Sequence, residues 1–340
     1  MQAALNPNIS PTPGSSPLLA IVGPTAVGKS ALAIALAKAF HGEIVNADSR
    51  QVYRLMDIGT AKPTAEERAQ ALHHLLDLVN PNQGYSLALF LEHATQAIEA
   101  IHQRGHLPIL AGGTGQYVWA LLEGWQAPEA PPDLELRRGL EAQAQREGAA
   151  ALYARLQALD PEAAAIIHPH NLRRIIRALE VYDATGVPFS QQRRRVAPAY
   201  RSLVMGLLLP REALYRRIDQ RVERAVGQGW VGEVQNLLQM GYSPDLPALS
   251  SLGYRELGRH LRGEVSLDEA VDHIKKATHR YARHQGAWFR RSDPRIHWLE
   301  AGPTLYDEAH TLVAAFLAEG ASPYGTIDPA QGAPASRERS

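Results

Sequence analysis

Residues 23–30, which read GPTAVGKS, are the segment whose composition and spacing most directly indicate chemistry. Their pattern is typical of a loop whose backbone amides surround phosphate oxygens at the start of a helix. In such a loop Lys29 reaches the terminal phosphates, and the hydroxyl of Ser30 can bind Mg²⁺. The pattern leaves open whether the phosphates belong to a nucleotide or to a leaving diphosphate. The predicted phosphate-binding residues are Gly23, Pro24, Thr25, Ala26, Val27, Gly28, Lys29 and Ser30.

A second polar group, Asp48 to Gln51, follows the apolar segment EIVNA at residues 43–47. Ligands of parallel α/β sheets bind at the carboxyl ends of the strands, so this group is expected beside the phosphate loop. Asp48 is a candidate catalytic carboxylate, although a helix cap or another structural role would also suit it. An ATPase or GTPase would further need a residue that orients the attacking water, and none is evident.

A third candidate is Thr114, which follows the apolar segment LPILA and two glycines. Gly112 and Gly113 allow the backbone to approach another group closely. The Thr114 hydroxyl could cap the next helix, donate a hydrogen bond into the ligand crevice, or do both.

These candidates are positioned by alternating strands and helices. The segments 18–23, 43–49 and 107–113 are predicted as buried strands, and helices are predicted after the first and third of them. A long helix is expected from Ser86, as its cap, to about Arg104. Gly42 is expected to end the helix that follows the phosphate loop. This alternation predicts an α/β fold whose parallel sheet has helices on both faces.

The character of the chain changes near residue 126, after which the sequence is helical and poor in strands until SLVMGLLLP at residues 202–210. We therefore predict an α/β core over 18–125 and 201–318, interrupted by a helical insertion over 126–200. Residues 1–17 and 319–340 are rich in Pro, Gly, Ser and Ala and are predicted to be a disordered leader and tail.

Composition narrows the classes of function. The 340 residues are 45% hydrophobic and 21% charged, and they contain no cysteine, which excludes disulfides, thiolate zinc sites and cysteine nucleophiles. No apolar run approaches the roughly 18 residues of a membrane span, and no secretory signal is recognisable, so a cytoplasmic location is expected. The formal net charge is zero. Nucleic acid is not thereby excluded, because its footprint is a local patch.

Arginine is clustered in two places that could follow an RNA backbone. Arg173 and Arg177 are spaced i, i+4 on one predicted helix face, with Arg174 beside them, and a second cluster occupies residues 193–195. Three later arginines are expected on a solvated face or in salt bridges; they are Arg211, Arg216 and Arg221.

The motifs together resemble one family, the bacterial tRNA dimethylallyltransferases. The matching segments are GPTAVGKS, NADSRQVYRLMDIGTAKP, HHLLDLVNPNQGYSLALF, PILAGGTGQYVWALLEG, NLRRIIRALEVYDATGVPFS, SLGYRELGRHLRG and IKKATHRYARHQGAWFRR, in the family's order over roughly residues 18 to 300. The resemblance implies a P-loop NTPase-like core with an inserted helical domain that grips the anticodon stem-loop of tRNA.

The implied reaction moves a dimethylallyl group from dimethylallyl diphosphate to N6 of adenosine 37 in tRNAs that read codons beginning with U. In that reaction the loop holds the diphosphate leaving group, with Mg²⁺ on Ser30, and Asp48 is the carboxylate best placed to take the N6 proton. The implied catalytic residues are Asp48 and Thr114. The implied tRNA-binding residues are Asp48, Ser49, Arg50, Gln51, Thr114, Arg137, Arg173, Arg174 and Arg177.

Some positions depart from the family pattern, and two other functions share the core. His279, His284 and Ala287 stand where the family tends to have other residues, so contacts are not carried over to them. A small-molecule P-loop kinase would use the same ATP-binding core without needing the insertion, and a nucleotide-binding regulatory module would not need Asp48. No obligate protein partner is evident, and a monomer is expected.

Overall fold

The computed structural model of the chain describes residues 16–126, 130, 133–192, 195–196 and 200–319. In that part of the chain the strands form one parallel sheet in the order β3-β2-β4-β1-β5-β6. The predicted α/β fold with a parallel sheet is confirmed. The strands are β1 (Ser16–Val22), β2 (Gly42–Asn46), β3 (His73–His74), β4 (Leu107–Ala111), β5 (Tyr200–Leu208) and β6 (Ile296–Glu300).

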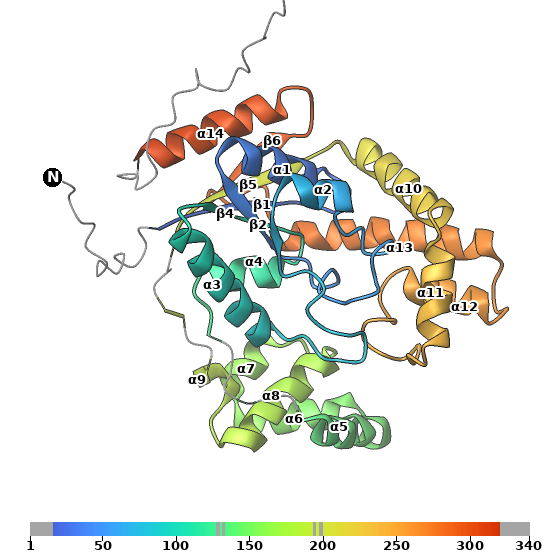
Figure 1. Cartoon of the computed structure of the whole chain (residues 1–340). Coiled ribbons are helices and arrows are strands. Elements are labelled where there is room, and N and C mark those ends of the chain that lie inside the picture. The colour runs from blue at the N-terminus through green and yellow to red at the C-terminus, as the bar shows by residue number, and fades with distance from the viewer. Residues whose placement is uncertain (1–15, 127–129, 131–132, 193–194, 197–199, 320–340) are drawn as a thin grey trace, which may run out of the picture.

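Helices cover both faces of the sheet (Figure 1). Alternate residues of a strand point to opposite faces, and β1 follows this rule. Leu19 and Ile21 pack with apolar residues of α1 and α14, whereas Leu18 and Ala20 pack with those of α3 and α4. These helices are α1 (Lys29–Ala39), α3 (Leu87–Gln103), α4 (Gly115–Leu122) and α14 (Leu305–Glu319), and a short α2 (Ala65–Gln70) precedes β3.

The predicted element boundaries are correct in some places and wrong in others. Ser86 caps α3 as expected, its hydroxyl accepting a hydrogen bond from the Leu89 amide at 3.2 Å. The predicted leader extends too far, because Ser16 and Pro17 pair with the first residues of β5 and thereby belong to β1. Gly42 does not end α1, which stops at Ala39; it is the first residue of β2. Residues 1–15 and 320–340 lie outside the described residues.

The segment between β4 and β5 contains α5 (Leu134–Glu147), α6 (Ala149–Leu159), α7 (Pro161–Ile166), α8 (Leu172–Thr185) and α9 (Phe189–Gln192). These helices have a hydrophobic cluster of their own, which includes Leu152, Leu156, Ile175 and Leu179. They lie together at one end of the molecule, below the sheet in the view of Figure 1.

Four further helices form a third group beside the sheet: α10 (Arg211–Gly227), α11 (Trp230–Gln239), α12 (Tyr254–Leu261) and α13 (Leu267–Trp288). Their shared cluster contains Trp230 and Leu257 and also Val52 and Met56 from the segment after β2. The α10–α13 group is therefore packed against the polypeptide that carries the second candidate motif. None of the described helices is long and apolar enough to cross a membrane.

One buried carboxylate organises the α5–α8 helices. Glu180 of α8 has no exposed surface, and it accepts hydrogen bonds from the Asp133 amide at 2.6 Å, Arg137 at 2.9 Å and Arg177 at 2.6 Å. Burial by itself favours the neutral acid, but the two guanidinium groups outweigh it and hold the pKa of Glu180 below its usual range. Glu180 thus joins the start of α5 to α8.

We expect Glu180→Ala to lower the free energy of unfolding by about 3 kcal/mol, because it leaves two guanidinium groups without their buried partner. Denaturant unfolding followed by circular dichroism measures the change. Glu141→Ala removes an exposed carboxylate of α5 and is the control, with an expected change within about 0.5 kcal/mol. Equal effects of the two substitutions would contradict the organising role of Glu180.

Candidate active site

The phosphate loop joins the end of β1 to the start of α1, as the sequence predicts. Gly23 and Gly28 have φ angles of 138° and 115°, which side chains disfavour. A Cβ at Gly23 would also lie only 2.9 Å from the carbonyl oxygen of Leu207 in β5. The two glycines therefore allow the loop to turn tightly against the neighbouring strand.

Lys29 folds back onto this loop. Its Nζ donates hydrogen bonds to the carbonyl oxygens of Gly23 at 3.1 Å and Pro24 at 2.7 Å. Burial lowers the pKa of Lys29 to about 8, Asp48 opposes this shift, and Arg221 adds to it. A poorly hydrated ammonium beside a second cation is suited to receive an anion.

Asp48 lies just after the carboxyl end of β2, which β4 separates from β1 and its phosphate loop. Its backbone amide donates to Asn46 Oδ1 at 3.1 Å, and its own Oδ1 accepts from the Arg50 amide at 2.8 Å. Burial lowers the pKa of both Lys29 and Arg221, and the negative charge of the Asp48 carboxylate opposes this shift in each. Oδ1 of Asp48 therefore stabilises the turn after β2, which is one of the structural roles that the sequence allowed. The role of Asp48 as a general base stays a prediction.

Thr114 contacts the segment that carries Asp48. Its Oγ1 accepts a hydrogen bond from the Ser49 amide at 3.0 Å and makes no capping hydrogen bond to α4. The side-chain cap that the sequence allowed is thus absent, and the hydroxyl proton is left for another acceptor. The approach depends on Gly112, since a Cβ there would lie 2.3 Å from the carbonyl oxygen of Ala47.

Arg50 and Gln51 are half-buried beside Asp48 and are held by backbone carbonyl groups. Arg50 donates to Pro247 at 3.0 Å, and the Gln51 amide donates to Thr60 at 3.1 Å and Ala61 at 3.0 Å. Ser49 is also half-buried. The structure therefore brings together the predicted residues Asp48, Ser49, Arg50, Gln51 and Thr114 at the carboxyl ends of β2 and β4.

Sequence reasoning missed three residues that contact the phosphate loop. Arg221 of α10 donates to Thr25 Oγ1 at 2.9 Å, and Arg217, one turn earlier, donates to the Val27 carbonyl at 3.2 Å. The expected solvated position of Arg221 is therefore wrong, because Arg221 is half-buried against the loop. Their i, i+4 spacing was visible in the sequence, but it did not indicate what that helix face contacts.

The third missed residue is Gln285 of α13, which is 4% exposed. Its Oε1 accepts from the Thr25 amide at 2.9 Å, and its Nε2 donates to the Gly113 carbonyl at 2.9 Å. One buried side chain thus ties the phosphate loop to the turn that precedes Thr114. A glutamine in an amphipathic helix carries no sequence signal for such a role.

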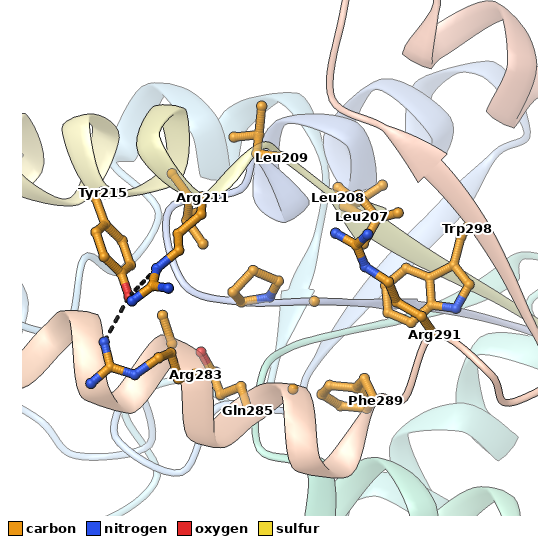
Figure 2. Close-up of a pocket in the computed structure, with 15 residues that line it drawn as sticks. Leu207, Leu208, Leu209, Arg211, Tyr215, Arg283, Gln285, Phe289, Arg291 and Trp298 are labelled. Carbon is orange, nitrogen blue, oxygen red and sulfur yellow. Dashed lines mark hydrogen bonds between the residues drawn. The ribbon is translucent and has the colours of Figure 1, made fainter.

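A cavity of about 340 Å³ opens between the phosphate loop, the end of β5 and the helices α10 and α13 (Figure 2). Apolar residues such as Leu207 and Phe289 line it, together with Arg211 and Arg283. Both arginines donate to the Tyr215 hydroxyl, at 3.2 and 2.6 Å. Burial opposes the effect, but these two cations hold the pKa of Tyr215 below its usual range. The cavity combines apolar walls with positive charge.

The residues that depart from the family pattern lie on α13. The His279 ring stacks on Tyr215 with ring centroids 3.9 Å apart, and its Nε2 lies 2.9 Å from Asp219. His284 and Ala287 are exposed. His279 thus has a packing role at the α10–α13 contact.

The predicted RNA-binding arginines divide into two kinds. Arg137 and Arg177 are half-buried and bound to Glu180, so their guanidinium groups already have a structural role. Arg173 and Arg174 are exposed on α8. The tRNA-binding role of these four arginines stays a prediction, and the structure adds that Arg137 and Arg177 also bind Glu180. Arg193 and Arg194 lie outside the described residues, and Arg195 pairs with Glu123 at 3.0 Å.

Comparison with known proteins gives consistent matches over most of the chain. The IPP transferase family model matches residues 51–292, and the isopentenyl transferase model matches residues 16–83. A tRNA dimethylallyltransferase from Roseiflexus sp. (strain RS-1) is 55% identical over 302 residues, which cover 88% of this chain and 99% of the relative. One from Dehalococcoides mccartyi is 45% identical and covers 92% of this chain and 96% of the relative.

Two solved structures are also similar. The full-length tRNA isopentenylpyrophosphate transferase of Bacillus halodurans has a TM-score of 0.67 at 40% identity, covering 90% of this chain and 98% of that protein. A eukaryotic dimethylallyltransferase, whose structures follow its action on tRNA, has a TM-score of 0.76 at 27% identity, covering 91% and 81%.

The lowered pKa of Lys29 makes the stability of the protein depend on pH. Between about pH 8 and 10.5 the unfolded chain binds more protons at this lysine than the folded chain, so folding becomes more favourable as pH rises. Relative to Lys29→Met, which cannot titrate, the wild-type free energy of unfolding should rise by roughly 3 kcal/mol across this window.

Urea unfolding at several pH values measures the difference, and the same substitution at the exposed Lys38 controls for losing a lysine from α1. If the difference in the free energy of unfolding between wild type and Lys29→Met does not change with pH, the folded loop does not disfavour the protonated form of Lys29.

Proposed function

The chain belongs to the IPP transferase family of tRNA dimethylallyltransferases, and on that premise we propose how its site performs the transfer. The prenyl donor is dimethylallyl diphosphate, and the acceptor is N6 of adenosine 37, next to the anticodon, in tRNAs that read codons beginning with U. A cytoplasmic location suits this substrate. One observation carries the assignment of roles: Gln285 joins Thr25 of the phosphate loop to Gly113, and the adjacent Thr114 accepts a hydrogen bond from the amide of Ser49, the residue after Asp48. A carboxylate is thus placed beside the phosphate loop.

The loop serves the leaving group in this proposal. As the bond between the allylic carbon and the diphosphate oxygen breaks, negative charge develops on that oxygen. Lys29, the loop amides and the Arg221 guanidinium stabilise this charge. Arg221 already contacts Thr25 of the loop. No water-orienting residue is required, because the nucleophile is an amine and the loop does not hydrolyse a nucleotide.

The acceptor amine must lose a proton as its new bond to carbon forms. Bond formation to the allylic carbon makes N6 cationic and therefore acidic. The carboxylate of Asp48 then accepts the N6 proton. The Thr114 hydroxyl, whose oxygen is held by the Ser49 amide, donates toward the amine or the diphosphate. Ser49, Arg50 and Gln51 line the pocket for the base, which leaves the loop stack to reach them.

Mg²⁺ is proposed as the cation that accompanies the diphosphate. Ser30 is exposed at the first turn of α1, where its hydroxyl can contribute one oxygen ligand. The described residues contain no group of three or more His, Asp or Glu side chains suited to a metal. The Ser30 hydroxyl together with the oxygens of the diphosphate would suit Mg²⁺, because this ion is commonly held by phosphate oxygens with few protein ligands. When bound, the ion would neutralise charge on the leaving diphosphate.

The α5–α9 helices are proposed to grip the anticodon stem-loop. Arg173 and Arg174 are exposed on α8 and make no ion pair within the described part of the chain, so they are available to phosphates. Arg137 and Arg177 support this surface through Glu180 and contribute less to the RNA directly. The net neutrality of the chain is compatible with this surface because the positive charge is local.

We expect the wild-type protein to form a prenylated adenosine from dimethylallyl diphosphate and unmodified tRNA, detected by mass after nuclease digestion. The absence of a prenylated adenosine would favour the kinase or the regulatory alternative. Asp48→Asn should lower the single-turnover rate by about 10²- to 10⁴-fold, since an amide accepts a proton very poorly. Both substrates should still bind.

Asp268→Asn, at an exposed carboxylate in the first turn of α13, is the control and should leave the rate unchanged. If Asp48→Asn lowers only the melting temperature while the rate stays normal, Asp48 is a turn-forming residue and not the base.

Changing both Arg173 and Arg174 to Gln should weaken tRNA binding and flatten its dependence on salt. The slope of log K against log[salt] should fall by about 0.7–0.9 for each phosphate that the protein no longer neutralises. Fluorescence anisotropy at several salt concentrations measures the slope. Lys38→Gln, on α1 far from these helices in Figure 1, is the control. An unchanged slope in the double variant places the RNA on another surface.

A further inference from the structure

The segment 57–61, which follows Asp48 to Gln51 in the chain, is held by one carboxylate from a distant helix. Glu233, in the first turn of α11, accepts hydrogen bonds from the backbone amides of Asp57 at 2.7 Å, Ile58 at 2.7 Å and Gly59 at 3.1 Å. Its Oε1 also accepts from the Tyr254 hydroxyl at 2.7 Å. Three successive amides thus surround an anion that the protein itself supplies.

The surroundings of this carboxylate fix it against the core of the α10–α13 group. A Cβ at Gly59 would lie 2.1 Å from Trp230 Nε1, so the loop approaches α11 more closely than a side chain allows. Tyr254 is 2% exposed, and burial, followed by the nearby charge of Glu233, raises its pKa. Its hydroxyl therefore remains a donor to Glu233.

The far end of the segment is fixed separately by Lys62, whose Nζ contacts the Tyr53 carbonyl at 2.5 Å, Asp57 at 2.6 Å and Asp77 at 2.5 Å. Between these two anchors lie the carbonyl groups of Thr60 and Ala61. Both accept hydrogen bonds from the Gln51 side-chain amide. With both amide hydrogens engaged, Oε1 of Gln51 is the polar atom left for a ligand, and it can only accept.

We propose that Glu233 is a positioning residue for the RNA substrate: it fixes segment 57–61, and that segment orients Gln51 to present an acceptor to a base N–H group. The inference rests on the proposed function for the identity of the ligand. The proposed effect of Glu233 concerns tRNA binding and not the diphosphate, because the hydrogen bonds of Glu233 in the described structure go to segment 57–61 and Tyr254 and not to the phosphate loop.

Glu233→Gln tests this role, because an amide replaces one acceptor oxygen with a donor that faces backbone N–H groups. We expect kcat/KM for tRNA to fall by about 10- to 100-fold, the range expected for losing a hydrogen bond to a charged group. The KM for dimethylallyl diphosphate should change by less than about twofold, because the phosphate loop is untouched. If Glu233→Gln folds poorly, Tyr254→Phe is the second variant, because it removes only one of the four hydrogen bonds to Glu233. It should lower kcat/KM for tRNA by a smaller factor and leave the KM for dimethylallyl diphosphate unchanged.

Glu256→Gln is the matched control. Glu256 is also a buried carboxylate of the α10–α13 group that accepts from a backbone amide, that of Gly253 at 2.7 Å, but it does not contact segment 57–61. It should lower the melting temperature without changing kcat/KM for tRNA selectively. A selective loss in Glu256→Gln equal to that in Glu233→Gln would overturn the proposal, since general destabilisation would then explain both.

A double-mutant cycle tests the connection to Gln51. If Glu233 acts through Gln51, the combination of Glu233→Gln with Gln51→Ala should be no slower with tRNA than Gln51→Ala alone. Additive losses would overturn that connection.

Hydrogen exchange tests the positioning without relying on turnover. Amides 57–59 and 49–51 should exchange faster in Glu233→Gln than in Glu256→Gln. Unchanged exchange at these amides would overturn the inference, even if the wild type transfers the prenyl group. A wild type that transfers none, with faster exchange in Glu233→Gln, would instead overturn the proposed function alone.

Discussion

The arrangement of the site depends on the close approach of two backbone segments at the carboxyl ends of β2 and β4. Gly112 lies so near the Ala47 carbonyl that any side chain would collide with it. This approach allows the Ser49 amide to reach Thr114 and the Gly113 carbonyl to reach Gln285. Because Gln285 also binds the Thr25 amide, the phosphate loop is tied to the same point. Three strand ends thus share one hydrogen-bonded network.

The α10–α13 helices complete this network from outside the sheet. Arg217 and Arg221 contact the phosphate loop, Gln285 joins it to β4, and Glu233 holds the segment after β2. Each of these interactions joins a helix to a group near the sheet edge. A group of helices that packs on its own apolar cluster therefore also determines the shape of the ligand site. Loosening this group is expected to affect both substrates, but through different residues.

The distribution of arginine illustrates how charge serves two purposes in one molecule. Arg137 and Arg177 neutralise a carboxylate that has no contact with water, and they hold α5 against α8. Arg173 and Arg174 lie about one helical turn or less from Arg177 and face solvent. Neighbouring arginines of the same helix thus differ in role according to which side of the helix faces the buried Glu180.

The sequence alone determined the phosphate loop, the parallel α/β sheet and the cluster from Asp48 to Gln51. These features depend on local patterns, namely glycine spacing, apolar segments and a polar group at a strand end. Tertiary structure decided that Arg221 and Gln285 bind Thr25 and that Glu233 binds segment 57–61, across at least 174 residues of chain. It also decided that Arg177 binds the buried Glu180, which its helical spacing did not indicate. The physical reason is the same in each case: local spacing sets which side chains share a helix face, but only packing sets what that face meets.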